Sequence, residues 1–374
     1  MKQQLNLEGY LSNGVANIVK EALKATLSNP KESIFMTKYA LAAKKASKLR
    51  KKSEENGNHI PPFLIASITS KCNLYCEGCY SRANNSCHDE KDDNLLTSLE
   101  WTKIFTEAKD LGVGFILLAG GEPFVRKDVI ENAAKIKEII FPVFTNGTMI
   151  SEEYLTLFDE NRNLIPVLSI EGDKVKTDSR RGDGVYEKLM DGMLKLQKKG
   201  IIYGASVTIT KENINEAVSS EFLSELLSEL SEKGCKVVFF VEFVPVTKDL
   251  AHLAPEEAER EFLKEKLISL KKSYENMLFI SFPGDEKTSG GCLAAGRGFF
   301  HINANGGAEP CPFSPYSDTN LRNVSLADAL NSPLFLALQN ENILMEEHPG
   351  GCVLFDRMDN VEEIMERNKM KTGN

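Results

Sequence analysis

The feature that most constrains the fold is a regular alternation of apolar, strand-like segments and amphipathic, helix-like segments between residues 61 and 246 of the 374-residue chain. Such an alternation is typical of parallel strands joined by right-handed helical crossovers. The predicted strands are 63–69, 114–119, 139–145, 165–170, 202–209 and 236–243, and the predicted helices are 96–111, 127–136, 152–159, 186–199 and 221–233.

Several of these strands, such as 237–240, are apolar throughout. Continuous apolar strands are expected where helices cover one face of a parallel sheet and a packed interior covers the other. We therefore predict an α/β fold, a partial (β/α)6 TIM-like barrel. Ligands of such folds bind at the carboxyl ends of the strands, so motifs that directly follow strands are the candidate site residues.

Three regions are predicted along the chain. Residues 1–57 are expected to form basic amphipathic helices, and residues 58–250 the barrel. Residues 251–374 are expected to form a small α+β domain, in which a charged helix over 255–274 and a strand over 277–282 precede a hairpin at Gly306-Gly307. Two short helices over 326–330 and 334–340 follow it.

Charge is distributed unevenly along the chain. Residues 1–60 hold 11 Lys and Arg against 5 Asp and Glu, whereas the remainder holds 34 against 49. An acidic body argues against nucleic acid as a partner. Six basic residues gather near the end of the second N-terminal helix: Lys44, Lys45, Lys48, Arg50, Lys51 and Lys52. They are either a solvated helix C-terminus, which favours cations, or a peripheral contact with an anionic membrane surface or an acidic partner.

The compartment is also suggested by the sequence. No apolar run reaches the roughly 18 residues of a membrane span, and residues 1–10 lack the apolar core of a signal peptide. We therefore expect a cytoplasmic protein. Because cytoplasmic thiols stay reduced, clustered cysteines indicate metal binding before disulfides.

Three cysteines, Cys72, Cys76 and Cys79, directly follow the first strand. Structural zinc usually takes two Cys-x-x-Cys pairs, whereas three thiolates on one loop suit a cubane iron–sulfur cluster with one iron left open. The Cys-x3-Cys-x2-Cys spacing in this position resembles the radical S-adenosylmethionine (radical SAM) superfamily. The resemblance implies that S-adenosylmethionine binds the open iron and is cleaved to a 5′-deoxyadenosyl radical. One departure is Gly78, where family members usually have an aromatic residue.

The same resemblance implies a cofactor seat at the ends of the next four strands. Gly120-Gly121-Glu122-Pro123 is similar to the Gly-Gly-Glu-Pro motif that binds the methionyl amine, and Ser169 and Glu171 share one face of a strand. Thr208 and Thr210 are further polar positions that are either in the lumen or merely tolerated. The implied cofactor-binding residues are Gly120, Gly121, Glu122, Asn146, Ser169, Glu171, Arg181 and Ser206.

Glu242 is the candidate catalytic residue. It lies within the apolar segment 237–246, where an ionised carboxylate is costly unless it is paired. It is either part of a structural salt bridge or part of the substrate pocket.

A second group of cysteines lies in the C-terminal region. Cys292 and Cys311 form a Cys-x13-Gly-x4-Cys element that resembles the start of SPASM and twitch extensions, and Cys352 follows. The resemblance implies an auxiliary 4Fe–4S cluster on these three, whose fourth ligand is open between His348, Cys87, a substrate atom and none. The alternative is that they are buried structural thiols. Cys87 is expected in an exposed polar loop, and Cys235 as a small buried hydrophobe.

The resemblance as a whole implies a radical SAM oxidoreductase that oxidatively modifies a peptide or protein. The auxiliary cluster would either take up the electron left on the substrate or anchor the substrate, and ferredoxin or flavodoxin would supply low-potential electrons. Two alternatives stay open. One is the same chemistry on a lipid or small membrane-proximal molecule, and the other is a non-catalytic iron–sulfur electron carrier or scaffold.

Overall fold

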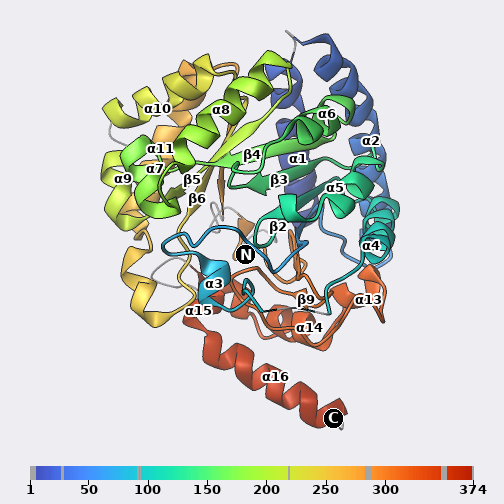
Figure 1. Ribbon diagram of the computed structural model, residues 1–374. Coiled ribbons are helices and arrows are strands. Elements are labelled where there is room, and N and C mark those ends of the chain that lie inside the picture. The colour runs from blue at the N-terminus through green and yellow to red at the C-terminus, as the bar shows by residue number, and fades with distance from the viewer. Residues whose placement is uncertain are drawn as a thin grey trace.

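The computed structural model describes residues 6–26, 29–90, 92, 94–217, 220–282, 289–346 and 352–372. Within this part of the chain, nine strands form one sheet in the order β7-β6-β5-β4-β3-β2-β1-β8-β9 (Figure 1). The strands are β1 (Phe63–Ser67), β2 (Phe115–Ala119), β3 (Phe141–Thr145), β4 (Leu164–Ser169), β5 (Gly204–Ile209), β6 (Val237–Glu242), β7 (Leu278–Phe282), β8 (His301–Ile302) and β9 (Ala308–Glu309). All neighbours pair in parallel except β8 and β9.

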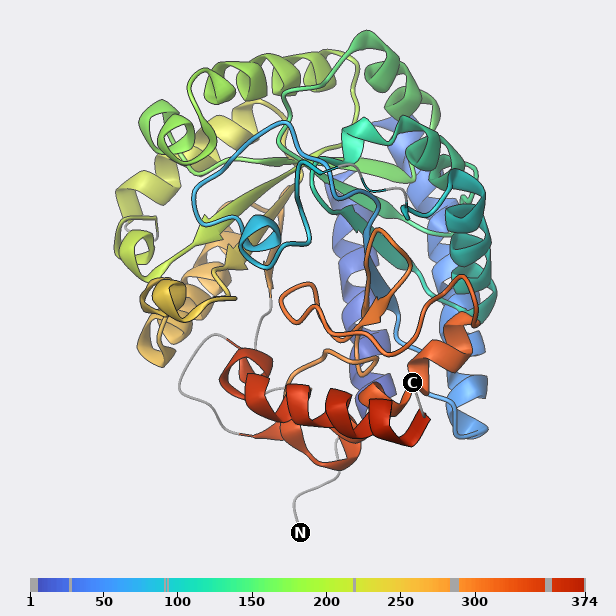
Figure 2. The ribbon, with the colours of Figure 1, turned by 60° about the horizontal axis from the view of Figure 1, so that its bottom comes forward.

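Helices surround the curved sheet on its outer face (Figures 1 and 2). The α-helices are α1 (Leu7–Ala25), α2 (Pro30–Glu55), α3 (Tyr80–Ala83), α4 (Ser98–Leu111), α5 (Lys127–Ala134), α6 (Glu152–Glu160), α7 (Lys174–Arg181), α8 (Val185–Lys198), α9 (Lys211–Ala217), α10 (Ser220–Glu232), α11 (Glu257–Ser273), α13 (Leu326–Leu330), α14 (Pro333–Asn340), α15 (Val353–Asp356) and α16 (Met358–Thr372). Three 3-10 turns are η1 (Pro123–Val125), η2 (Lys248–Leu253) and η3 (Ile343–Met345). The predicted partial barrel of parallel βα units is confirmed.

Helix α4 illustrates why the predicted helices form where they do. Thr97 and Glu100 make a capping box that satisfies backbone N–H groups at its start, and Gly112 ends it in the left-handed conformation. Between these signals, Trp101, Phe105 and other apolar residues at helical spacing are buried against the sheet.

The sheet extends beyond the six predicted strands. β7 adds a seventh parallel strand beside β6, and the β8–β9 hairpin joins the opposite edge through β1. The hairpin turns at Gly306-Gly307, as predicted, where the Gly306 N–H donates to Asn303 O. Because all three strands come from residues after 250, the C-terminal region completes both edges of the barrel sheet. The division of the chain into three domains stays a prediction.

The N-terminal helices pack on the amino-terminal ends of the barrel strands. Val19 of α1 and Met36 and Tyr39 of α2 form one cluster with Ile140, which precedes β3. The Tyr39 hydroxyl donates to Gly114 O at 2.7 Å. We call this end of the barrel, covered by α1 and α2, the floor, and the opposite end, where the strands finish, the rim.

The predicted basic group on α2 is smaller than its sequence suggests. Arg50 is buried, and its guanidinium donates from Nη1 to Gly112 O at 2.6 Å and from Nη2 to Ser12 Oγ. Five lysines of the group are exposed: Lys44, Lys45, Lys48, Lys51 and Lys52. Arg50 is therefore a structural link between α2 and the barrel. Among the described helices, none is both long and apolar enough to cross a membrane.

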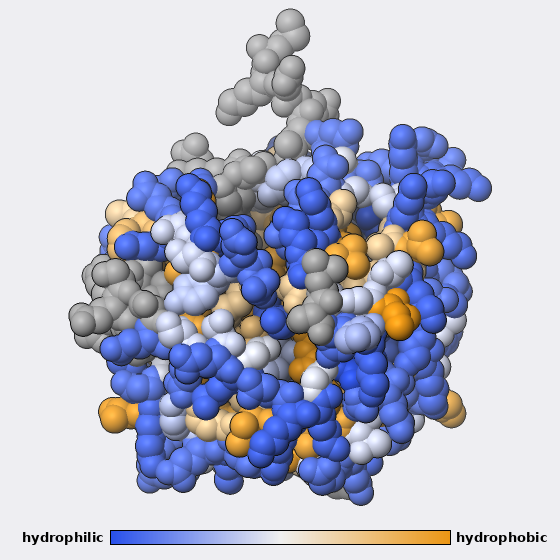
Figure 3. Space-filling model, turned by 90° about the horizontal axis from the view of Figure 1, so that it is seen from above, coloured by the Kyte–Doolittle hydropathy of each residue, from blue (hydrophilic) through white to orange (hydrophobic). Residues whose placement is uncertain are grey.

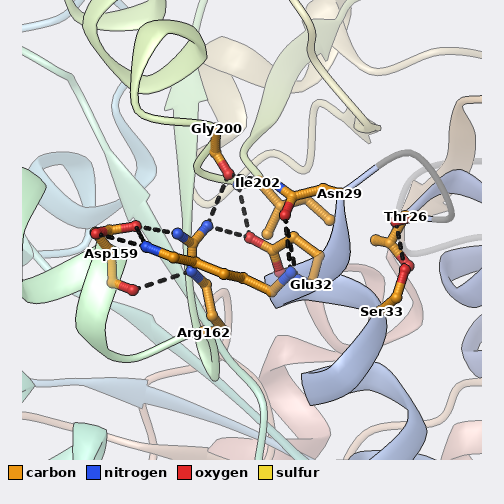
Figure 4. Close-up of polar contacts among 9 residues, drawn as sticks. Thr26, Asn29, Glu32, Ser33, Asp159, Arg162, Gly200 and Ile202 are labelled. Carbon is orange, nitrogen blue, oxygen red and sulfur yellow. Dashed lines mark hydrogen bonds and ion pairs between the residues drawn. The ribbon is translucent and has the colours of Figure 1, made fainter.

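A buried ion pair anchors the start of α2 to the barrel (Figure 4). The Arg162 guanidinium pairs with Glu32 and Asp159 and donates to Gly200 O at 2.7 Å. Burial outweighs the attraction of Arg162 and raises the pKa of Glu32. Asn29, the N-cap of α2, also donates to Gly200 O, at 2.6 Å.

The interior of the barrel is hollow, so the predicted packed interior is wrong. Along β2, Ile116 and Leu118 are buried against the outer helices, whereas the alternate residues Phe115, Leu117 and Ala119 face a cavity of about 790 Å³. This cavity, the lumen, runs from the rim to α1.

Candidate functional site

The cysteine loop after β1 lies across the rim of the barrel (Figure 2, light blue). Cys72, Cys76 and Cys79 all line the lumen. Burial raises the pKa of Cys72 to about 12 and also raises the pKa of Cys76, so a metal must displace their protons to bind. Among the described side chains, no three His, Cys, Asp or Glu could hold a single metal ion. A cubane makes a different demand, because each thiolate binds a different iron.

Two glycines let the loop after β2 cross the cysteine loop at backbone contact. A Cβ atom would lie 2.3 Å from Thr69 O at Gly120 and 2.0 Å from Lys71 O at Gly121. The loops are joined by hydrogen bonds from the Gly121 N–H to Thr69 O at 2.9 Å and from the Glu122 N–H to Lys71 O at 2.7 Å. No side chain fits at either position, which explains the glycine pair.

Glu122 is a buried carboxylate that lines the lumen. Burial raises the pKa of this carboxyl to about 7. This is the net result, because three hydrogen-bond donors and the charge of Arg181 act in the opposite direction. The donors are the Phe124 N–H at 3.0 Å, the Thr145 hydroxyl at 2.7 Å and the Asn146 N–H at 2.7 Å. These bonds hold the carboxylate in one orientation. Because its negative charge is still costly in the buried site, a cationic group that binds beside it would stabilise it.

Asn146 connects the end of β3 to the cysteine loop. Its amide donates to Asn73 Oδ1 at 2.8 Å, and the Asn73 amide donates to the Thr148 hydroxyl at 2.8 Å. Asn73 lies next to Cys72, so this network fixes the loop against the rim. The predicted residue Asn146 therefore has a loop-positioning contact as well as a place at the lumen.

Ser169 and Ser206 face each other on neighbouring strands. They are register partners of β4 and β5, and their hydroxyl oxygens are 3.1 Å apart. Both line the lumen, together with Thr208 two residues further along β5. Of the two alternatives that the sequence left open for Thr208, the structure shows a place in the lumen.

Glu171 and Arg181, two of the predicted cofactor residues, bind each other. Arg181 donates to Glu171 Oε1 from Nε at 2.9 Å and from Nη2 at 2.5 Å. Arg180, which the sequence analysis did not select, donates to the same oxygen at 2.6 Å and also pairs with Thr208. The second oxygen of Glu171 has no part in these ion pairs, so the arginines orient the carboxylate.

An aromatic ring lies beside the third cysteine although the chain has Gly78 there. Gly78 adopts a φ of +65°, and its hypothetical Cβ would lie 3.3 Å from the ring of Phe243. Phe243 follows β6, and both Phe243 and Cys79 line the lumen. The backbone needs glycine at this position, and the ring comes from another strand.

Glu242 fits both of its predicted interpretations. Its carboxylate is buried and pairs with Arg260 of α11 at 3.0 Å, and it also lines the lumen at the rim. A role for Glu242 in catalysis stays a prediction.

The three C-terminal cysteines are buried in the same hydrophobic core. The Cys292 N–H donates to Leu344 O at 2.7 Å, and the Ala295 N–H donates to Pro310 O at 3.0 Å, next to Cys311. The segments that carry Cys292 and Cys311 are thus adjacent. His348, one proposed fourth ligand, lies outside the described residues. Cys87 is buried, so its expected exposure is wrong. Cys235 is buried, as expected.

A buried histidine links the β1 strand to the C-terminal hairpin and was not found from the sequence. His301 of β8 hydrogen-bonds through Nδ1 to Glu309 of β9 at 2.6 Å and through Nε2 to the Ser67 hydroxyl of β1 at 2.7 Å. Ser67 precedes the Cys72 loop, and Glu309 precedes Cys311. No local pattern indicates such a contact, because it depends on the pairing of β1 with β8.

Comparison with known proteins identifies the central part of the chain. Residues 66–223 match the family model for the radical SAM superfamily. An AdoMet-dependent heme synthase of Methanosarcina barkeri is 27% identical over 323 residues, covering 78% of this chain and 87% of that protein. A PqqA peptide cyclase of Rhizobium meliloti is 27% identical over 270 residues, 67% of this chain and 68% of that one.

Another relative, an Fe-coproporphyrin III synthase of M. barkeri, is 30% identical over 182 residues, and this chain spans only 43% of its length. Among solved structures, SuiB of Streptococcus suis bound to its precursor peptide SuiA is similar, with a TM-score of 0.62 at 19% identity. The match covers 84% of this chain and 72% of SuiB. At this identity the likeness supports the fold.

Proposed function

Because this chain is an enzyme of the radical SAM superfamily, we propose that it removes a hydrogen atom from an organic substrate and oxidises that substrate. The cofactors are a 4Fe–4S cluster and S-adenosylmethionine, which together supply a 5′-deoxyadenosyl radical as the hydrogen-atom acceptor. We propose that Cys72, Cys76 and Cys79 hold the cluster.

The observation that carries this proposal is the convergence of the cysteine loop and the polar strand ends around one lumen. The residues fit the two cofactors. At Gly120 and Gly121 the chain offers a ligand bare backbone, because neither residue has a side chain. Glu122 presents a buried carboxylate to an amine. Ser169 and Ser206 offer adjacent hydroxyls to a carboxylate or ribose.

An oxidative outcome needs an acceptor for the electron that remains on the substrate after hydrogen abstraction. We propose that Cys292, Cys311 and Cys352 hold an auxiliary cluster in this role. Support comes from the hydrogen bonds that hold the segments of Cys292 and Cys311 side by side, and from Pro312 and Phe313, which directly follow Cys311 and line the lumen. The substrate then loses one hydrogen atom, one electron and one proton.

The proposed substrate is a peptide or protein. The support is that the chain resembles a peptide cyclase over two thirds of its length and shares its fold with SuiB, which was solved with a precursor peptide. A low-potential donor such as ferredoxin or flavodoxin is proposed to supply the electrons.

A second candidate is a lipid or membrane-proximal substrate, favoured by the five exposed lysines of α2. Their replacement by Gln is expected to abolish sedimentation of the protein with vesicles that contain anionic lipid, while Arg50 is left in place. Equal sedimentation of the variant and the wild type would contradict this candidate.

The central experiment measures iron, sulfide and 5′-deoxyadenosine after anaerobic reconstitution and reduction. We expect about eight irons per chain, falling to about four with loss of 5′-deoxyadenosine when Cys72, Cys76 and Cys79 are all replaced by Ala. Cys235→Ala, which removes a buried thiol that does not line the lumen, is the control. Four irons falling to none would leave the C-terminal cysteines structural, and an intact cluster without 5′-deoxyadenosine would favour an electron carrier.

A further inference from the structure

The lumen continues well below the proposed cofactor seat. Ser169 ends β4 and Thr208 is the second-last residue of β5, whereas Phe115, Val237 and Leu278 begin their strands and also line the lumen. A five-residue strand spans roughly 13 Å from its first to its last Cα atom. The lumen therefore has a lower part, between the rim and the floor, that the cofactor seat does not use.

The strands surround this lower part with apolar side chains. Six strands each contribute, for example through Ile65, Leu117, Phe144, Val167, Phe239 and Ile280. The charged residues among the described lining, Glu122, Arg180, Arg181 and Glu242, all lie at the rim. A cavity with apolar walls is poorly suited to water and well suited to an apolar ligand.

Residues of α1 line the lumen at the floor. Asn13, Gly14 and Asn17 are exposed, yet they line the same cavity as Val15 and Ile18. The molecule seen from above shows hydrophobic residues among hydrophilic ones in the middle of the view (Figure 3). Helix α1 is thus both a wall of the lumen and part of the molecular surface.

Gly14 lies where a large side chain could obstruct a ligand that passes α1. It lies inside α1, where glycine costs about 1 kcal/mol relative to alanine. No packing contact explains it, because nothing lies within 4 Å of its hypothetical Cβ.

We propose that the lower lumen binds an apolar chain, the alkyl or isoprenoid part of the substrate, which extends from α1 at the floor toward the cofactor rim. This inference rests on the proposed radical chemistry and, of the two candidate substrates, it applies to the lipid or membrane-proximal molecule. A bare peptide is disfavoured there, since its backbone needs hydrogen-bond partners that the apolar walls lack. A tetrapyrrole is disfavoured because its acidic arms find no cation below the rim.

The test measures binding of cis-parinaric acid, a fluorescent fatty acid, to the full-length protein, with palmitate and geranylgeraniol as competitors. We expect saturable binding that either competitor displaces, and the stronger one identifies an alkyl or an isoprenoid chain. Leu117→Trp fills the lumen and is expected to weaken binding at least tenfold. Val175→Trp, the same type of change at an exposed apolar residue of α7, is expected to leave it unchanged.

A second pair of variants avoids the barrel core. Gly14→Trp is expected to slow association of the probe at least fivefold, whereas Ala16→Trp, at an exposed residue of the same helix that does not line the lumen, is expected to have no effect. Because both changes lie on the surface of α1, they also test the proposal if Leu117→Trp does not fold.

The proposal is overturned by an absence of saturable binding, or by equal effects of each variant and its control. Displacement of the probe by coproporphyrin III or an oligoleucine peptide, but not by palmitate or geranylgeraniol, also overturns it. If the probe fails to bind while the reconstituted enzyme still forms 5′-deoxyadenosine, the proposed function stands without this inference. If the probe binds but no 5′-deoxyadenosine forms, the proposed function fails instead.

Discussion

At the scale of single residues, the buried carboxyl of Glu122 has a strongly raised pKa. Its burial raises the pKa to about 7, so the carboxylate gains a proton as the pH falls through 7. A protonated carboxyl cannot form a charge-assisted bond with the amino group of S-adenosylmethionine. We expect the affinity of the reconstituted enzyme for S-adenosylmethionine, measured by equilibrium dialysis, to fall about tenfold per pH unit below 7.

Glu122→Gln removes the negative charge but keeps the size of the side chain. It is expected to weaken binding at pH 8 by roughly tenfold or more, since a hydrogen bond to a charged group contributes about 1.5–3 kcal/mol. It should also flatten the pH dependence between 6 and 8. A variant that keeps the wild-type pH profile would show that another group titrates.

Gly121 and Gly14 offer the same substitution with opposite expected results. Gly121→Ala places a Cβ 2.0 Å from Lys71 O, so the cysteine loop must move. We expect a loss of about 2 kcal/mol in the free energy of unfolding and reduced iron incorporation. Gly14→Ala meets open space inside a helix and is expected to stabilise the protein by about 1 kcal/mol.

Urea denaturation followed by circular dichroism measures both changes. The iron content of each variant after reconstitution shows whether the loss at Gly121 acts on the cysteine loop. Equal stability of the two variants would contradict the close crossing of the loops after β1 and β2.

At the scale of elements, His301 connects the strand that precedes the Cys72 loop to the hairpin that precedes Cys311. His301→Leu leaves the Glu309 carboxylate buried without its histidine partner and the Ser67 hydroxyl without its acceptor or donor. Each unsatisfied buried group costs about 1–3 kcal/mol. We expect a strong loss of thermal stability together with a lower iron content, because both cysteine segments lose a fixed anchor.

His252→Leu is the matched control for this prediction. His252 is exposed in η2, and its removal is expected to leave melting temperature and iron content unchanged. If the melting temperature of His301→Leu equals that of His252→Leu, the hydrogen bonds of His301 to β1 and β9 do not stabilise the protein.

At the scale of the whole molecule, the N-terminal helices and the barrel are held together by the apolar cluster at the floor and by a few buried polar contacts. Glu32→Gln removes the charge that pairs with Arg162 in the contact between α2 and the barrel (Figure 4). Breaking one side of a buried ion pair costs about 3 kcal/mol. We expect this loss in urea denaturation, whereas Glu21→Gln, which breaks the exposed pair with Lys24, should cost below about 1 kcal/mol.

A shift of similar size in both variants would mean that the buried pair does not anchor α2. Proteolysis provides a second measurement. If the anchor holds the helices on the floor, Glu32→Gln is expected to increase cleavage within residues 29–60, and Glu21→Gln is not.

Much of the fold followed from local patterns along the sequence. The apolar and amphipathic periods predicted most barrel elements within a few residues, since each period reflects which side chains one element buries. The same logic placed the cysteine loop at a strand end, whereas it left Thr208 open between the lumen and mere tolerance. Short elements such as α7 were missed because four to eight polar residues carry too little periodicity.

What the sequence by itself determined is therefore most of the barrel elements, their parallel arrangement and the residue types available at each strand end. Only the tertiary structure decided which distant residues meet, because pairing of β1 with β8 and closure of the helices over the floor depend on contacts between segments far apart in the chain. Local patterns cannot encode those contacts. That is why the pairing of Glu171 with Arg180, the ring of Phe243 beside Gly78, and the hollow lumen emerged only from the folded chain.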